Sequence, residues 1–373
     1  MKMHKGKLFS LICTCVLIFS MAITQPLAIA AATSETKVGR EHVVFADRIQ
    51  ELKDKEQNDK VSADNFTTKS LLDFAGNEYT LVECEPSGYL IFHNASGVFV
   101  ESSLESPSPY KDYDENIYYN GPLGYYVEKD GELVHTITQG VIVKPISTLT
   151  AEASSINETL LQQKDNQVLD FVNFGIPMNS EIRASGDTYV EDYTVIRDLV
   201  KEEEMGYKNG GLCGYIAGGM AILHLQAHSG LKLIPSGYLT ETGLKFNGSG
   251  FTEYLRNTYG VTNATTASSL AIVLNTYFNA KKYIVSASHG ALASGNQIKD
   301  SINNNQTMML GGQFYSDPDD TSSEQVFHFI LAYGYNNTEF IVHYGWGDCS
   351  QVRVNNAVLI LQSLNYVKLN ITP

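Results

Sequence analysis

One cysteine lies where a glycine-rich turn meets an apolar helix, in the stretch Asn209-Gly-Gly-Leu-Cys213-Gly-Tyr-Ile-Ala-Gly-Gly-Met220. The glycines permit a tight turn and the close approach of another backbone or a substrate. The apolar residues that follow predict a helix over residues 212–227. A helix N-terminus lowers the pKa of a thiol, and only the thiolate is a strong nucleophile. The position of Cys213 therefore favours a reactive cysteine.

A histidine in an apolar, strand-like run follows far downstream, in Val326-Phe-His328-Phe-Ile-Leu-Ala. The next segment is Phe340-Ile-Val-His343-Tyr-Gly-Trp346-Gly-Asp348. The alternative for Cys213 is a small buried hydrophobe. Taken alone, His328 is better interpreted as a core histidine bonded to a backbone carbonyl. An early cysteine, a late histidine and a following Gly-Trp-Gly together indicate a cysteine hydrolase.

The N-terminus has the pattern of a secretory signal peptide, residues 1–31. A basic start is followed by an apolar run from Leu8 to Ile23 and by small residues from Ala28 to Ala32. Two of the five cysteines lie inside this segment. We therefore expect a secreted, extracellular protein with no membrane segment after export, in which three cysteines remain. An odd number of cysteines cannot all pair in disulfides within one chain, so at least one remains a thiol.

The composition excludes some partners. The formal net charge is −15, with 41 Asp and Glu against 26 Lys and Arg. Such an acidic chain is a poor match for nucleic acid or for anionic membrane surfaces. The expected partners are a protein or peptide substrate.

The sequence pattern changes near residues 177–187. This stretch is rich in polar and small residues, and we interpret it as a linker. Before it, residues 77–103 predict a small antiparallel sheet, with helices around residues 40–57 and 151–165. After it, helices are predicted over 212–227, 250–259, 268–278 and 297–304. Strands are predicted over 307–311, 327–333, 339–344 and 357–362. Helices first and strands later indicate an α+β domain.

The second half resembles the papain-like cysteine peptidases, and within them the secreted bacterial streptopain group. The resemblance is carried by Cys213 with Ala217 and His224 on its helix, by the run from Ile298 to Gly311, and by His328-Phe-Ile-Leu-Ala-Tyr-Gly334. The element His343-Tyr-Gly-Trp346-Gly stands where the group has Asn-Trp-Gly-Trp-Gly. The resemblance implies a papain-like fold, a Cys-bearing helix packed on an antiparallel sheet, and a prosegment with strands such as those near Tyr89 and Phe99.

The resemblance also implies roles for the site residues. Cys213 is the expected nucleophile and His328 the general base. His343 occupies the place of the asparagine that orients the histidine, with Asp348 in reserve, and Trp346 shields that hydrogen bond. The group has a glutamine oxyanion donor six positions before the cysteine. Here that position is Tyr207, and the nearest amide is Asn209, so these two are the candidate oxyanion or support residues.

Two other uses of these residues remain open. Cys213 and Cys349 are candidates for a disulfide that would abolish thiol chemistry, although structural disulfides usually come in fuller sets. His224 and His228 lie one turn apart on one helix face, as metal ligands do, but no third ligand is near in sequence. We expect neither a metal nor a cofactor.

The sequence thus predicts a thiol protease made as a zymogen, with a signal peptide (1–31), an α+β prosegment that inhibits the enzyme (32–186) and a papain-like peptidase domain (187–373). Hydrolysis would pass through a Cys213 thioester. Two alternatives remain: a catalytically inactive papain-like binding module, and a cysteine amidase acting on cell-wall peptides.

Overall fold

The computed structural model describes residues 27–56, 58–137, 139–142, 144–166, 186–201, 212–241, 243–244, 250–260, 266–312, 328–346 and 349–371. Most of the predicted signal peptide, and the predicted linker as far as residue 185, lie outside this part of the chain. The chain divides into two compact units, Met1–Phe45 and Ala46–Pro373. Helix α1 (Leu27–Glu56) begins in the first unit and ends in the second. All sites discussed below belong to the second unit.

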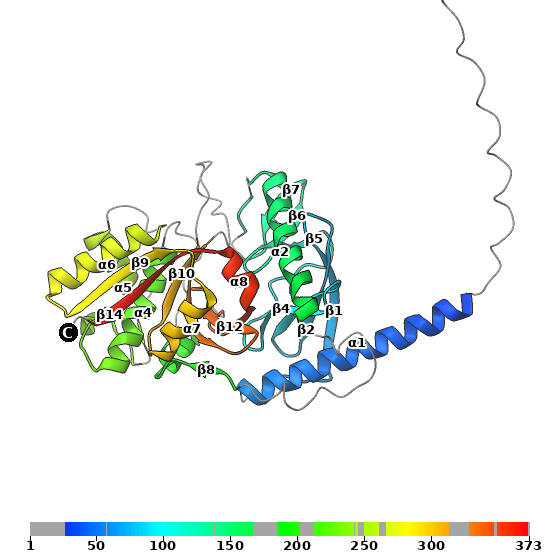
Figure 1. Ribbon diagram of the computed structural model, residues 1–373, viewed down its shortest axis with the longest axis horizontal. Coiled ribbons are helices and arrows are strands. Elements are labelled where there is room, and N and C mark those ends of the chain that lie inside the picture. Colours follow the sequence, from blue (N-terminus) through cyan, green and yellow to red (C-terminus); the bar gives the residue numbers. More distant parts are fainter. Residues whose placement is uncertain are drawn as a thin grey trace, which may run out of the picture. The chain divides into compact units, whose positions relative to one another are not determined.

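The strands of the described residues form one large, mostly antiparallel sheet (Figure 1). Its order is β7-β6-β5-β1-β2-β3-β4-β13-β12-β11-β10-β14-β9, and β8 pairs with β11. Only β1 and β5 pair in parallel among these strands. The strands are β1 (Phe66–Leu72), β2 (Glu78–Cys84), β3 (Tyr89–His93), β4 (Val98–Ser103), β5 (Ile117–Tyr119), β6 (Tyr125–Lys129), β7 (Glu132–His135), β8 (Thr188–Tyr189), β9 (Val285–Ala291), β10 (Met308–Gly312), β11 (His328–Tyr335), β12 (Glu339–His343), β13 (Val352–Asn355) and β14 (Ser363–Ile371).

The sheet joins the two halves of the sequence through one strand pair. Glu101 in β4 is opposite Val354 in β13, and Ser102 is opposite Arg353. Strands of the predicted prosegment and strands of the predicted peptidase domain are therefore neighbours in the same sheet. The boundaries of the two domains stay a prediction.

The helices fall into two groups by their contacts. α4 (Cys213–Ser229), α5 (Phe251–Tyr259) and α6 (Ala267–Lys281) pack on one another, and α4 contacts β10, β11 and β14. α7 (Gly295–Asn303) and α8 (Asn356–Gln362) pack together, and α8 also contacts α2 (Ile146–Asn166). Short helical turns complete the described elements: α3 (Thr194–Arg197), η2 (Asp198–Lys201) and η3 (Ser236–Tyr238). The molecule is thus α+β, as expected.

Helix α4 is buried on all sides along most of its length, from Gly214 to Leu225. A helix that is apolar all round is a core helix rather than a surface one. Gly218 lets α6 come close, because a Cβ there would lie 3.2 Å from a methyl carbon of Leu274. The helix ends at Gly230, whose φ of 70° suits a left-handed cap. The apolar run after Cys213 therefore fixes the first turn of α4 firmly in the core.

One predicted element is wrong. Residues 357–362 were expected to form a strand, but they form most of α8. The side-chain oxygen of Asn355 accepts hydrogen bonds from the backbone N–H groups of Ala357 (3.1 Å) and Val358 (3.3 Å). This cap starts a helix, and a short apolar run alone does not distinguish a helix from a strand.

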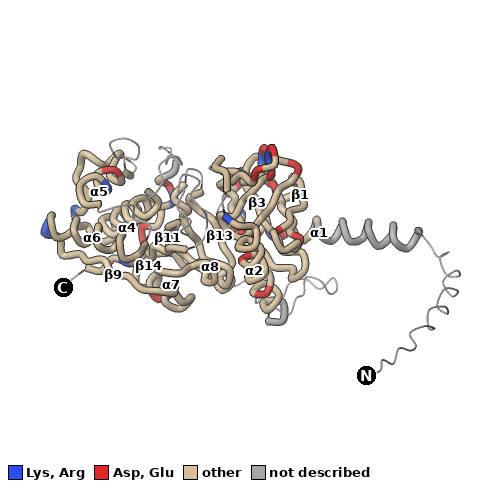
Figure 2. Tube along the Cα trace, turned by 90° about the horizontal axis from the view of Figure 1, so that it is seen from above, with Lys and Arg blue, Asp and Glu red and all other residues tan. Residues whose placement is uncertain are grey.

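The charge distribution follows the acidic composition. Figure 2 shows acidic segments around α2, β1 and α5, with few basic ones between them. Within the described residues, no helix combines the length and the apolar character needed to cross a bilayer.

Candidate active site

Cys213 is the first residue of α4, and its side chain is half-buried. The preceding residue, Leu212, provides no side-chain cap, so the N–H groups of the first turn are not occupied by such a cap. A helix N-terminus of this kind favours negative charge on a nearby sulfur. Tyr207 and Asn209, the candidate oxyanion residues, lie outside the described residues.

His328 is the first residue of β11 and is 6% exposed. Its Nε2 lies 2.7 Å from the backbone carbonyl oxygen of Tyr344. A carbonyl oxygen can only accept, so Nε2 carries the proton and donates it. In a neutral ring this leaves a lone pair on Nδ1. His328 is therefore held as a base whose reactive nitrogen is Nδ1.

Trp346 covers His328 from one side. The two ring centroids are 5.0 Å apart. The ring of His135, from β7, lies 5.8 Å from the Trp346 ring. His135 donates its own Nε2–H to the carbonyl of Leu123 at 2.9 Å. Trp346 thus packs against both a histidine of the late half and a histidine of the early half of the sequence.

The first turn of α4 meets the β11 end of this cluster. A Cβ placed on Gly345 would lie 3.5 Å from a methyl carbon of Ile216 and 3.9 Å from the carbonyl oxygen of Phe329. Ile216 is one turn after Cys213, and Phe329 follows His328. Gly345 also has a φ of 78°, a left-handed conformation that glycine adopts without strain. The sequence needs glycine here for the turn, and a Cβ would make only ordinary van der Waals contacts with α4 and β11.

His343 does not make the contact that the sequence predicted. The bond behind His328 goes to the Tyr344 carbonyl, while Nδ1 of His343 accepts the backbone N–H of Gly345 at 2.8 Å. The cause is strand geometry. His343 pairs with Leu331 and shares its face, whereas His328, three positions earlier, points to the opposite face. The predicted direct hydrogen bond from His328 to His343 is therefore absent, and Asp348, the reserve, lies outside the described residues.

Burial keeps all three histidines neutral. It lowers the pKa of His328 to about 4, although the hydrogen bond to Tyr344 raises it somewhat. It lowers the pKa of His343 to about 3, and that of His135 also to about 3. A closed site of this kind disfavours an imidazolium, so His328 stays neutral and is a weak base while it is covered.

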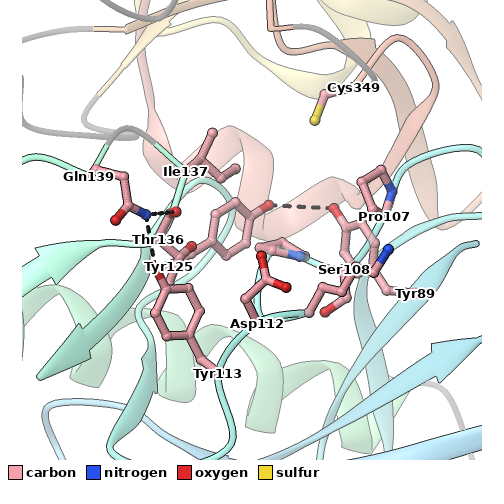
Figure 3. Close-up of a pocket in the computed structure, with 12 residues that line it drawn as sticks. Tyr89, Pro107, Ser108, Asp112, Tyr113, Tyr125, Thr136, Ile137, Gln139 and Cys349 are labelled. Atoms are coloured by element: carbon pink, nitrogen blue, oxygen red, sulfur yellow. Dashed lines mark hydrogen bonds between the residues drawn. The ribbon is translucent and has the colours of Figure 1, made fainter. Parts of the chain in front are cut away.

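The three described cysteines differ in their surroundings, and none forms a disulfide. The predicted alternative of a Cys213–Cys349 bridge is therefore absent from these residues. Burial raises the pKa of the Cys84 thiol to about 12, which makes it unreactive. Cys349 lines a cavity of about 220 Å³ whose other walls come from residues 89–139, as Figure 3 shows. The cavity lies in the same neighbourhood as the site, because Thr136 adjoins His135 and Cys349 hydrogen-bonds to the Trp346 carbonyl at 3.3 Å.

The histidine pair on α4 has other partners. His224 shares a 2.7 Å hydrogen bond with the carbonyl of Glu191, and Nδ1 of His228 lies 3.4 Å from the carboxylate of the same residue. No group of three His, Cys, Asp or Glu side chains in the described part of the chain is arranged to hold a metal ion. These contacts tie α4 to the segment after β8.

Sequence reasoning did not find His135 or the Tyr344 carbonyl. A carbonyl is present at every residue, so no side-chain pattern could have indicated it. His135 ends a short strand with no other catalytic candidate in it, and only the folded sheet brings it to Trp346. Among the residues predicted for catalysis, the structure groups His328 with Trp346 and sets the first turn of α4 beside them.

Comparisons with known proteins give weak similarities. No family model matches the chain, and no curated protein matches it. A structure described as a C39-like peptidase from Bacillus anthracis is 12% identical, covers 50% of this chain and 99% of that one, and gives a TM-score of 0.30. A fragment of prointerpain A from Prevotella intermedia is 9% identical, covers 81% of this chain and 98% of that one, and gives a TM-score of 0.34. Similarities of this size do not assign an activity.

Proposed function

We propose that the chain is an exported cysteine peptidase made as a zymogen, with Cys213 as nucleophile and His328 as general base and acid. The observation that carries the proposal is the hydrogen bond from His328 Nε2 to the Tyr344 carbonyl. It fixes the tautomer with Nδ1 available, on a strand that packs against the helix beginning at Cys213.

The proposed reaction has two halves. Nδ1 of His328 takes the thiol proton while the Cys213 sulfur attacks the carbonyl carbon of a peptide bond. The proton then passes to the departing amine as the C–N bond breaks, leaving a thioester on Cys213. In the second half, His328 takes a proton from a water that attacks the thioester. The acid is released, and the proton returns to the sulfur.

The negative charge that develops on the substrate carbonyl oxygen during the attack must be stabilised by hydrogen-bond donors. The backbone N–H groups in the first turn of α4 are the candidate donors, because the first N–H groups of a helix have no partner within the helix itself. Asn209 and Tyr207 are the side-chain candidates from the sequence. An oxyanion site built largely on a helix end would explain why the chain does without the glutamine of the resembling group.

The zymogen part of the proposal concerns residues 32–186 as the enzyme's own inhibitor. Support comes from His135, which packs against Trp346, and from β4, which pairs with β13. The cavity walls of residues 89–139 also face Cys349. Residues of the early half therefore cover the neighbourhood of His328, as an inhibitory segment should. Cleavage in the predicted linker would weaken this cover.

The test is active-site labelling of the full exported chain. A peptidyl inhibitor that reacts with thiols should modify Cys213 in the wild type and in a Cys349→Ser variant, but not label a Cys213→Ala variant. The labelled residue is identified by peptide mass spectrometry. A specific protease site placed within residues 177–186 should increase the labelling rate once it is cut. Unchanged labelling after the cut would remove the zymogen part and leave the peptidase part.

The same test separates the alternative functions. An inactive papain-like binding module would react at Cys213 no faster than at a free cysteine and would hydrolyse nothing. A cysteine amidase would be labelled but would cleave cell-wall peptides in preference to protein substrates.

A further inference from the structure

One peptide unit joins His343 to His328. The N–H of Gly345 donates to Nδ1 of His343 at 2.8 Å, and the carbonyl of Tyr344 accepts from Nε2 of His328 at 2.7 Å. That N–H and that carbonyl belong to the same planar peptide group. The two imidazoles, on opposite faces of the sheet, are therefore connected by two hydrogen bonds through a single rigid unit.

The state of His343 suits this connection. Nδ1 accepts a hydrogen bond, so the ring is neutral and its proton is on Nε2. Burial lowers the pKa of His343 to about 3, which keeps the ring neutral across the physiological range. Nε2 is buried and has no hydrogen-bond partner. A buried donor without a partner is unfavourable, so the sequence retains this histidine at a cost in stability.

We infer that His343 is a positioning residue: by holding the Tyr344–Gly345 peptide, it fixes His328 in the Nε2–H tautomer. A peptide that donates at its N–H end and accepts at its carbonyl end is also polarised, which strengthens the bond to His328. The consequence for catalysis rests on the proposed function, because only a Cys213 thiol would use the lone pair left on Nδ1.

The geometry explains why an asparagine can stand in the same place. Asparagine side chains commonly accept the backbone N–H two residues on, as His343 does with Gly345. An amide oxygen at position 343 can therefore hold the same peptide. An apolar side chain of similar size, such as leucine, fills the space but leaves the peptide free to rotate.

The test measures the tautomer of His328 directly, by nitrogen-15 NMR of the full exported chain labelled at histidine. The His328 signals are assigned from their loss in a His328→Gln variant. We expect the Nε2–H tautomer for both His328 and His343 in the wild type and for His328 in His343→Asn. We expect a mixture with the Nδ1–H tautomer for His328 in His343→Leu, and a fall in kcat of roughly tenfold with KM little changed.

Two results would overturn the inference. One is a wild-type His343 in its Nδ1–H form, which needs no variant and so does not depend on how a variant folds. Another is an unchanged His328 tautomer in His343→Leu. Tautomer shifts as expected in a chain that hydrolyses nothing would uphold the positioning role and defeat the proposed function, so the two failures are distinguishable.

Discussion

Two buried polar clusters in this protein are built in opposite ways. In the first, His328, His343 and His135 are neutral and make few hydrogen bonds, and one ring nitrogen has no partner. In the second, the guanidinium of Arg353 is fully buried, and carboxylates surround it. Burial keeps the first cluster uncharged, and the second cluster uses charges to join segments.

The Arg353 cluster links three distant parts of the sequence. Arg353, in β13, is 2.6 Å from the carboxylate of Glu56 in α1 and 2.6 Å from that of Asp187, while Glu339 in β12 lies 3.8 Å away. Burial alone would raise the pKa of Asp187, but Arg353 lowers it below its ordinary value. Burial raises the pKa of Glu56 in spite of the same partner. Arg48 of α1 forms a further ion pair with Glu339.

The charged cluster has a structural role, and the histidine cluster has a chemical one. The charged cluster holds α1 and the chain at Asp187, where the predicted peptidase domain begins, against β12 and β13. In the histidine cluster, His343 and His328 lie on β12 and β11 of the same sheet, and His135 lies on β7, at the far end of the strand order. Removing a member of the first should therefore change mainly stability, and removing a member of the second should change mainly reactivity.

The largest expected effect on stability is at Arg353. Replacing it by methionine leaves Glu56 and Asp187 buried without their cation, while Glu339 keeps Arg48, so the free energy of unfolding should fall by about 3–5 kcal/mol. Arg353→Lys, which keeps a charge, should cost less. Urea denaturation measures both. A loss below 1 kcal/mol for Arg353→Met would show that the cluster does not hold these segments together.

The next effect is a pH dependence from the histidine cluster. The pKa of His328 falls from 6.5 to about 4 on folding, so the unfolded chain binds more protons between these values. Stability should therefore be lost as the pH falls from 6.5 towards 4, with about 3 kcal/mol of the loss due to His328. In His328→Gln this contribution should vanish, which urea denaturation at several pH values will reveal. Parallel curves for the two proteins would contradict the buried, neutral state of His328.

The smallest effect concerns Thr136, beside His135. Its side chain is 6% exposed, and its hydroxyl has no hydrogen-bond partner. Thr136→Val keeps the shape and removes the unsatisfied group, so stability should change by less than about 1 kcal/mol and in the favourable direction. Thermal denaturation is sufficient to measure this. A clear loss of stability would mean that the hydroxyl has a partner, such as an ordered water.

Short sequence patterns predicted the two elements that carry Cys213 and His328, because neighbouring residues determine where these elements form. The glycines before Cys213 and the apolar run after it gave the start of α4, and the apolar run around His328 gave β11. The role of His343 could not be predicted in the same way. Its side chain points to the other face because of its pairing with Leu331, and the partner of His328 is a main-chain atom.

The sequence also did not predict which distant strands pair with each other. The pairing of β4 with β13 joins residues about 250 positions apart, and nothing in either strand's sequence indicates the other. The misassigned strand at 357–362 shows the same limit at short range, because a single Asn355 cap outweighed an ambiguous apolar run. Sequence patterns predict most helices and strands and the candidate residues, but only the folded structure shows which of these residues are in contact.

The central claim is that His328 activates Cys213, and the reactivity of the thiol tests it most directly. The measurement is the rate at which iodoacetamide alkylates Cys213 in the full exported chain carrying Cys349→Ser and cut at the protease site placed within residues 177–186, with and without His328→Gln. Cys84 reacts little, because burial raises its pKa to about 12. The account predicts that at pH 7 alkylation is at least about tenfold faster with His328 present. Equal rates in the two proteins would contradict it.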